Sequence, residues 1–180
     1  MARLPDINEA ELSSEQRSVY EEITRLRGQV RGPFAVRLRN AELCESALKL
    51  QNLFASRVKF PRRLIQLMNL ISARLAGAQF AWFVHEPHAL KQGIPRDIVE
   101  AIREGRTPDF TREDERVVYD ITLELNTTRS LSEANYNRGM SIFGEQAMVE
   151  LVSAIGFYAM VAMTLNAFEV AVPVDKNPLP

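Results

Sequence analysis

Residues that start and end helices divide most of this chain into segments of helical length, and this spacing constrains the fold more than any other feature. Ser13 and Ser14 can cap the start of a helix, because a serine oxygen accepts hydrogen bonds from free backbone N–H groups. Gly28 can end that helix, because glycine adopts the left-handed backbone conformation readily. The same alternation continues to Phe168, and no strand-like alternation of useful length interrupts it. The sequence therefore predicts an all-α fold.

Further helices are expected by the same rules. Their expected starts are Asn40, Pro61, Ala78, Pro95, Thr111, Ser132 and Glu145, and their expected ends lie near Phe54, Ala76, Gly93, Gly105, Leu125, Gly144 and Phe168. Residues 32–34 are expected to form a turn, and Thr107–Phe110 a linker.

Several local details are expected within these helices. Thr111 and Asp114 resemble a capping box. Pro87 lacks the N–H that would bond the carbonyl of Phe83, so a kink or an early end is expected there. The apolar residues of the helix that starts at Asn40 fall on one face, namely Leu43, Ala47, Leu50 and Phe54.

Composition narrows the function classes. The chain has 180 residues and a formal net charge of −1, which gives no electrostatic case for binding nucleic acid. The single Cys44 excludes an intrachain disulfide and a zinc site built from several thiolates.

The first ten residues turn polar too early for a signal peptide, so a cytoplasmic location is expected. The apolar segment Val149–Phe168 is interpreted as a buried helix, with a membrane span as the less favoured alternative.

A histidine stands inside an apolar stretch rich in small residues. Trp82 and His85 share a helical face with Ala78, and Ala81 lies beside them. The two alanines would leave either a small pocket next to the histidine or room for close packing of another helix. Gln66, on the preceding helix, would meet His85 if the two helices pack side by side.

A metal site is disfavoured in this stretch. His85 and His88 are three residues apart, whereas the metalloprotease pattern requires histidines four apart. No third ligand is evident in the sequence, so no metal is predicted.

The order of these motifs resembles the carboxymuconolactone decarboxylase-like family, a branch of the alkylhydroperoxidase D-like fold. The similar residues are Gly32-Pro33-Phe34, Gly77, Trp82, His85-Glu86-Pro87, Ala89-Leu90, Gly93 and Asn166-Ala167-Phe168-Glu169-Val170 before Pro173. The resemblance implies an N-terminal helical extension at 1–31, a family domain at 32–173 and a C-terminal tail at 174–180. It also implies a homo-oligomer, a trimer or hexamer, with the last apolar helix partly buried between subunits. The tail would be an arm that wraps a neighbour or a disordered segment.

The chain departs from the redox members of that superfamily at the reactive positions. Their two cysteines fall on Ala78 and Ala81, so reduction of peroxide by a thiolate is excluded. The position of their glutamate falls on Gln66, which keeps hydrogen bonds and loses acid–base function.

The resemblance implies a decarboxylase-like lyase or an isomerase that uses no cofactor and acts on a small carboxylated lactone or cyclic acid. His85, with a pKa near neutrality, would transfer the proton, and Gln66 would orient it. The expected substrate contacts are Phe34, Arg37, Arg74, Trp82 and His88. The alternative is a small-molecule-binding protein of the same fold that has no catalytic activity. No nucleic-acid or membrane partner is expected.

Overall fold

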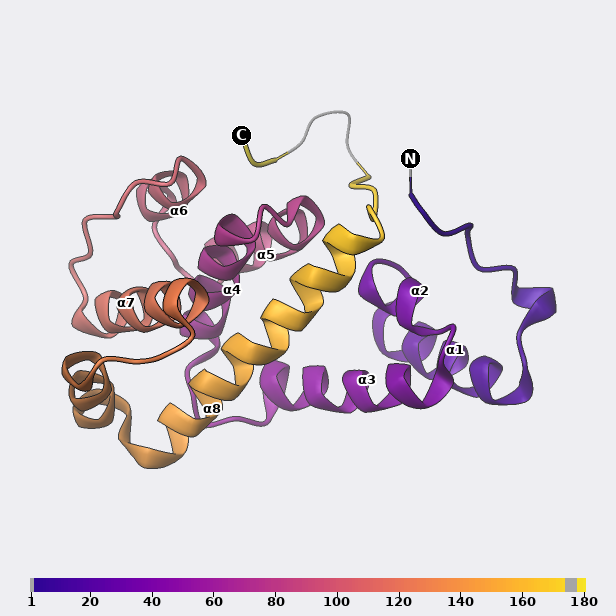
Figure 1. Ribbon diagram of the computed structural model, residues 1–180, viewed down its shortest axis with the longest axis horizontal. Helices are drawn as coiled ribbons and strands as arrows, with labels where there is room; N and C mark the ends of the chain where they lie inside the picture. Colours follow the sequence, from indigo (N-terminus) through magenta and orange to yellow (C-terminus); the bar gives the residue numbers. More distant parts are fainter. Residues whose placement is uncertain (1, 174–177) are drawn as a thin grey trace.

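The structure, a computed structural model, describes residues 2–173 and 178–180, and all regular elements within them are helices (Figure 1). The predicted all-α fold class is confirmed. A short 3₁₀ helix, η1, comes first and eight α-helices follow it: η1 (Glu9–Glu11), α1 (Ser14–Arg27), α2 (Pro33–Arg37), α3 (Ala41–Ser56), α4 (Arg62–Leu75), α5 (Gln79–Lys91), α6 (Arg96–Arg103), α7 (Glu113–Thr128) and α8 (Glu133–Ala167).

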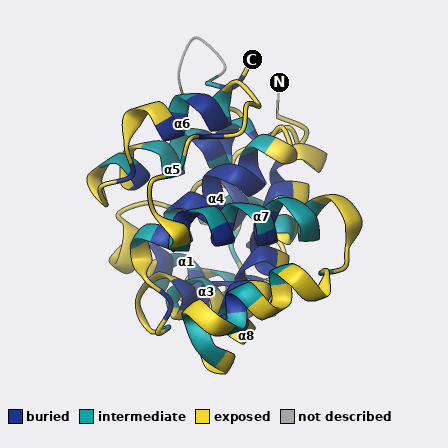
Figure 2. Cartoon of the chain, turned by 90° about the vertical axis from the view of Figure 1, so that its left-hand side faces the viewer, coloured by how far each residue is buried: buried dark blue, intermediate teal, exposed yellow. Residues whose placement is uncertain are grey.

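Helix α4 is the central element of the main core. It packs against α5, α7 and α8, and more lightly against α3 and α6. Almost every residue from Leu64 to Ala73 is buried, including the polar Asn69 and Ser72 (Figure 2). A helix surrounded in this way must satisfy its buried polar groups through its neighbours.

The N-terminal helices form a second, smaller core. Ser13 caps α1 in a reciprocal capping box with Gln16, and Gly28 ends the helix with a φ of 79°. Val19 and Ile23 of α1 pack against Phe34 and residues of α3. The helices on the two sides of the expected boundary between residues 31 and 32 therefore share apolar contacts.

Helix α8 runs along the molecule as the longest element (Figure 1). Gly144 interrupts it with a φ of 73° and a ψ of 173°, so the helices predicted to meet there appear as two arms of one element. By length and composition alone α8 could cross a membrane. However, half of its most apolar window is buried inside the molecule, and it packs against α2, α3, α4, α5 and α7, as a core helix does.

Two expectations for helix starts are wrong. Residues 32–34 do not form a simple turn, because Pro33 opens helix α2, where its missing N–H costs nothing. Thr111 does not cap α7, which begins after Arg112 without a side-chain cap. Asp114 instead pairs with Arg112 and with Arg63 of α4.

Two expectations for helix interiors also fail. On α3, Leu43 and Leu50 are exposed, because Cys44 and Leu48 supply the face that packs on α1 and α2. Of the two alternatives expected at Pro87, a kink or an early end, the early end is wrong, because helix α5 continues through Pro87 to Lys91.

One face of α8 remains apolar and exposed. Met163 is 62% exposed and Val149 is 63% exposed, and Val152, Gly156 and Met160 lie between them at helical spacing on the same side. An exposed apolar stripe of this length is typical of a contact between subunits.

We expect Met163→Glu to lower the oligomeric state in solution, because it puts a charge into the apolar stripe. Light scattering coupled to size exclusion would measure the mass of each variant. Ser141→Glu, at an exposed position on the other arm of α8, is the matched control and should leave the mass unchanged. A wild-type chain that is monomeric at every concentration would contradict this expectation.

Candidate functional site

The packing of α4 against α5 brings together two side chains that the sequence analysis singled out. His85 Nδ1 lies 2.9 Å from Gln66 Oε1, although 19 residues separate them in the chain. Asn69, one helical turn after Gln66, places its Nδ2 atom 3.2 Å from the same ring nitrogen. Two amides on one face of α4 therefore hold the imidazole of α5.

These contacts define the tautomer of His85. The shorter contact is to a carbonyl oxygen, which only accepts, so Nδ1 carries the proton and donates it to Gln66. The Asn69 oxygen Oδ1 is buried and has no partner in the described part of the chain, and turning that amide would offer the oxygen to the same N–H. Nε2 has no hydrogen-bond partner among the described residues and is not fully enclosed, so its lone pair is available to a ligand.

His85 is uncharged at neutral pH. Desolvation, with a smaller contribution from the nearby His88, lowers the pKa of its ring to about 3. The amides of Gln66 and Asn69 carry no charge that would stabilise an imidazolium. The expected pKa near neutrality is therefore wrong, because burial between helices outweighs the polar contacts.

A pocket of about 340 Å³ opens beside His85. Its inner wall comes from α5 and α8, and its outer wall comes from the end of α1 and the start of α2. Among the described residues no aspartate or glutamate lines it, whereas Arg27 and Arg31 do. Its lining includes Arg27, Arg31, Phe34, Phe80, His85 and Tyr158.

The two arginines at this pocket have no carboxylate partner among the described side chains. Arg27 lies over the ring of Phe34 at 5.0 Å and donates to Asn52 Oδ1 at 2.9 Å. Arg31 is exposed and forms no ion pair in the described part of the chain. A pocket lined by two guanidinium groups without ion-pair partners favours an anionic ligand.

Tyr158 of α8 completes the wall behind the imidazole. Its ring meets His85 edge to face, with the ring centroids 5.5 Å apart. Burial raises the pKa of Tyr158, while the Asn69 amide and the Arg27 charge oppose that shift. The phenol therefore stays protonated and can donate a hydrogen bond.

The predicted site residues separate into two groups. Phe34 and His88 line the pocket beside His85, as expected. Gln66 lies behind the imidazole and lines a smaller cavity of about 120 Å³, which His88 borders from the other side. Arg37, Arg74 and Trp82 line neither cavity, so their expected placement at the site is wrong.

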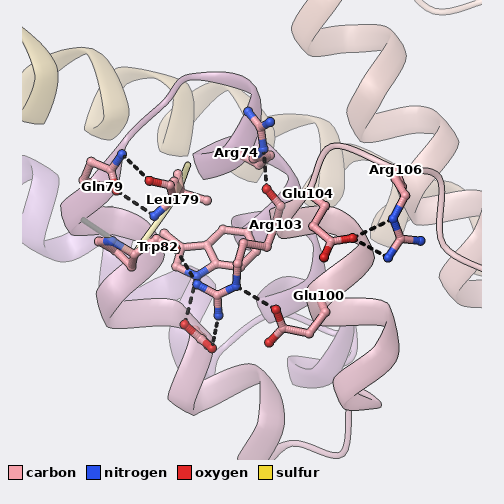
Figure 3. Close-up of polar contacts among 10 residues, drawn as sticks. Arg74, Gln79, Trp82, Glu100, Arg103, Glu104, Arg106 and Leu179 are labelled. Carbon is pink, nitrogen blue, oxygen red and sulfur yellow. Dashed lines mark hydrogen bonds and ion pairs between the residues drawn. The ribbon is translucent and has the colours of Figure 1, made fainter. Parts of the chain in front are cut away.

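Trp82 faces away from the pocket. Its indole Nε1 donates to Glu86 Oε2 at 2.9 Å, and Arg103 of α6 lies over the ring at 5.1 Å (Figure 3). Arg103 also pairs with Glu86 and with Glu100. Trp82 therefore fixes α5 against α6, since a fully buried indole needs a partner for its N–H.

The two arginines outside the pocket have other partners. Arg74 donates through Nε to the carbonyl of Arg103 at 2.7 Å, which ties α4 to the end of α6 (Figure 3). Arg37 is buried and donates to Thr164 Oγ1 at 3.3 Å on α8, while its Nη1 atom is enclosed without a partner. Burial lowers the pKa of Arg37.

The end of the chain packs on the same side of α5 as Trp82. Residues 174–177 of the expected tail lie outside the described residues. Gln79 donates to the carbonyl of Leu179 at 3.2 Å and accepts from its N–H at 2.8 Å (Figure 3). Leu179 is buried, and Arg103 binds the carbonyl of Pro178. The described end of the tail is thus ordered against its own chain.

Sequence reasoning missed Arg27, Arg31 and Tyr158. Arg27 and Arg31 flank Gly28 in a segment treated as a helix end, and their spacing carries no site motif. Tyr158 lies in the apolar arm of α8, where an aromatic residue looks like ordinary core. A polar hydroxyl inside that otherwise apolar run was the one usable signal for it.

The lone thiol takes no part in the site. Cys44 is fully buried in the smaller core, and burial raises its pKa to about 11. No described residues gather as a group of three that would hold a metal ion. The pocket offers imidazole, phenol, guanidinium and amide groups instead.

Solved structures match the fold of this chain, whereas no family model and no curated protein matches its sequence. A cysteine-to-alanine variant of the debrominase Bmp8 in complex with 2,3,4-tribromopyrrole is 17% identical, with a TM-score of 0.76 over 99% of this chain and 96% of that chain.

Two peroxidase-related proteins described as uncharacterized are similar in the same way. The one from Silicibacter sp. TM1040 is 13% identical, with a TM-score of 0.77 over 98% of this chain and 94% of its own. The one from Ralstonia eutropha JMP134, described as an alkylhydroperoxidase AhpD core, is 12% identical, with a TM-score of 0.78 over 97% and 93%. The chain therefore has the alkylhydroperoxidase D-like fold.

Acidification should destabilise the protein through His85. The pKa of His85 is about 3 in the folded state against an ordinary value of 6.5 in the unfolded chain, so the unfolded chain binds more protons between these values. The free energy of unfolding should then fall as pH drops from 6.5 towards 3, by up to about 1.4 kcal/mol per pH unit from this group. Urea unfolding at several pH values would measure this slope.

Matched variants distinguish the contribution of His85 to the pH dependence of stability from the contributions of other titrating groups. His85→Gln should flatten the pH dependence, because it removes the group that must stay neutral. His88→Gln, at an exposed position three residues away, should keep most of it. Equal slopes for wild type and His85→Gln would contradict the assignment.

Proposed function

We propose that the chain is a cofactor-independent enzyme that transfers a proton on a small carboxylated lactone or cyclic acid, as a lyase or an isomerase. His85 is the proton-transferring residue, and Gln66 is its positioning residue. The observation that carries the proposal is the arrangement at one imidazole. Nδ1 is held by Gln66, and the ring borders a pocket whose described lining includes two arginines without a carboxylate partner and no aspartate or glutamate.

The ionisation of His85 favours a reaction that begins with removal of a proton. A neutral imidazole whose Nδ1 bears hydrogen accepts a proton at Nε2 and becomes an imidazolium. It can return that proton to another carbon of the same ligand, which completes an isomerisation without a net change in protons. A reaction that begins with loss of carbon dioxide would instead need a proton donor for the carbon that retains the electron pair.

The ligand carboxylate assists this transfer. Its negative charge beside the ring would stabilise the imidazolium and raise the low pKa of His85. Arg27 and Arg31 would hold the carboxylate, and the phenol of Tyr158 would donate to an oxygen of the ligand. Phe34 and Phe80 would pack on the ring of the ligand.

A second candidate function is binding without chemistry. The observation that favours it is the same low pKa, since a group with a pKa of about 3 is a weak base until a ligand arrives. A carboxylate that raises the melting temperature while its carbon-bound hydrogens remain in place would support this candidate.

Exchange of carbon-bound hydrogen with solvent deuterium tests the catalytic proposal even when the product is unidentified. Five- and six-membered lactone and ring carboxylates would be incubated with the protein in deuterium oxide and followed by proton NMR. We expect exchange next to the carbonyl for at least one ligand, and a loss of at least about 10²-fold in rate for His85→Gln. Lys91→Gln, at an exposed position of the same helix that lines neither cavity, is the matched control and should retain most of the rate. Binding of the ligands without exchange in the wild type would exclude the enzyme.

Gln66→Glu tests the positioning role of Gln66. A carboxylate at 2.9 Å from Nδ1 would stabilise the imidazolium, so the pKa of His85 should rise by one unit or more. Nitrogen-15 NMR of the ring would measure that pKa directly. Gained decarboxylation in this variant would mark the chain as a degenerate decarboxylase, whereas loss of the native exchange would mark a specialised enzyme. An unchanged pKa would show that Gln66 does not act on His85.

A further inference from the structure

A second cavity of about 450 Å³ lies next to the pocket that contains His85. Its walls come from the N-terminal segment, from α2 and from the residues that follow α8. It shares Gln29, Arg31 and Phe80 with the first pocket. The two spaces are therefore neighbours, and Phe80 borders both.

The wall of this second cavity is held in place by polar contacts. Arg3 bonds the carbonyls of Ala167 and Phe168 through its side chain and its backbone N–H, and it pairs with Glu169 at 2.7 Å. Arg39 of the loop after α2 donates to the carbonyl of Pro5. These ties fix the N-terminal segment over the end of α8, so the cavity is built into the fold.

The lining of the second cavity is mostly apolar. Leu4, Ile7, Val36 and Val170 contribute aliphatic surface, in addition to Phe80. Gln29 and Arg31 line both spaces, whereas His85, His88 and Tyr158 line only the first of the two. The other polar side chains of the second cavity are Asp6, Tyr20 and Arg39. Such a lining suits hydrocarbon, because burial of apolar surface is favourable and no partner is required.

The backbone at Gly32 allows Phe80 to stand between the cavities. Gly32 has a φ of 61°, and a Cβ atom there would lie 2.5 Å from Cε1 of the Phe80 ring. Only glycine therefore lets the ring lie against this backbone. The ring thus lies against residue 32, and it lines both cavities.

We propose that the site takes an elongated amphipathic carboxylate, whose apolar chain passes Phe80 and occupies the second cavity. Its carboxylate lies at Arg31, and its reacting end lies at His85. Phe80 is the residue that determines which chains are accepted. The position of the carboxylate rests on the proposed function, but occupation of the second cavity by hydrocarbon does not.

A chain-length series tests this inference. The binding of straight-chain carboxylates from butanoate to decanoate would be measured by calorimetry with the full-length protein. We expect the affinity to rise about two- to fourfold per added methylene through the longest members, because each group leaves water for an apolar wall. An affinity that stops rising once the first pocket is full would overturn the inference.

Variants assign the gain to the second cavity. Leu4→Glu places a charge in its wall and should return decanoate to the affinity of the short members, with butanoate unchanged. Leu43→Glu is the matched control, since Leu43 is 49% exposed and lines neither cavity. Equal effects of the two variants on decanoate would also overturn the inference.

Phe80 is tested separately from the cavity wall. Phe80→Ala should admit carboxylates with a phenyl-substituted chain that the wild type binds at least about tenfold more weakly. Phe83→Ala, on the same helix and outside both cavities, should not. A Phe80→Ala protein that fails to fold leaves the Leu4→Glu comparison and the wild-type series as complete tests.

The outcomes also distinguish this inference from the proposed function. If butanoate and the ring carboxylates bind but affinity does not rise for longer chains, only the second-cavity inference fails. If long chains gain affinity while no ligand exchanges hydrogen, only the catalytic proposal fails. Arg31→Gln should weaken the whole carboxylate series by a constant factor, since it acts on the head group alone.

Discussion

The contact between α4 and α5 is the constraint on which the site depends. Helix α4 is buried along most of its length, so its polar residues must find partners on neighbouring helices. Gln66 and Asn69 find one at His85, which is itself too deep to be hydrated fully. A single packing interface thus orients the imidazole and keeps it uncharged.

Helix α5 serves this arrangement with two different faces. One face carries His85 and Phe80 and borders the pocket. The other carries Trp82 and Glu86, which Arg103 joins to α6 in a cluster that the chain end covers (Figure 3). The partly buried charges of Arg103, Glu86 and Glu100 compensate one another. The helix is therefore anchored to α6 by residues that lie outside the pocket.

The sequence was sufficient to predict the all-α fold, because the residues that start and end helices act on the backbone next to them. Ser13, Asn40 and Ser132 accept bonds from first-turn N–H groups, as expected, and the glycines at 28 and 144 act where the pattern indicated. The pairing of Gln66 with His85 followed from two adjacent helices of known length. In contrast, the orientation of Trp82 depends on Arg103, which approaches from α6. A helical wheel of α5 carries no information about a side chain from another helix.

The arginines also show that a local sequence pattern does not predict contacts between helices. Arg37 was expected at the pocket because it follows the residues that line it, yet its guanidinium crosses to Thr164 on α8. Arg27 and Arg31 reach the pocket because α1 packs on α3 and brings its end over α5, which depends on the smaller core. The positions of these arginines thus depend on how the two cores pack together. A sequence pattern within one helix does not predict them.

The neutral amides that hold the imidazole give the site its particular chemistry. A glutamate in place of Gln66 would favour an imidazolium at all times. This chain has neither a carboxylate at Gln66 nor a thiol at Ala78 or Ala81. The charge that stabilises the protonated ring must then arrive with the ligand. A carboxylate held by the outer arginines would supply that charge, so binding and protonation of His85 become one linked step.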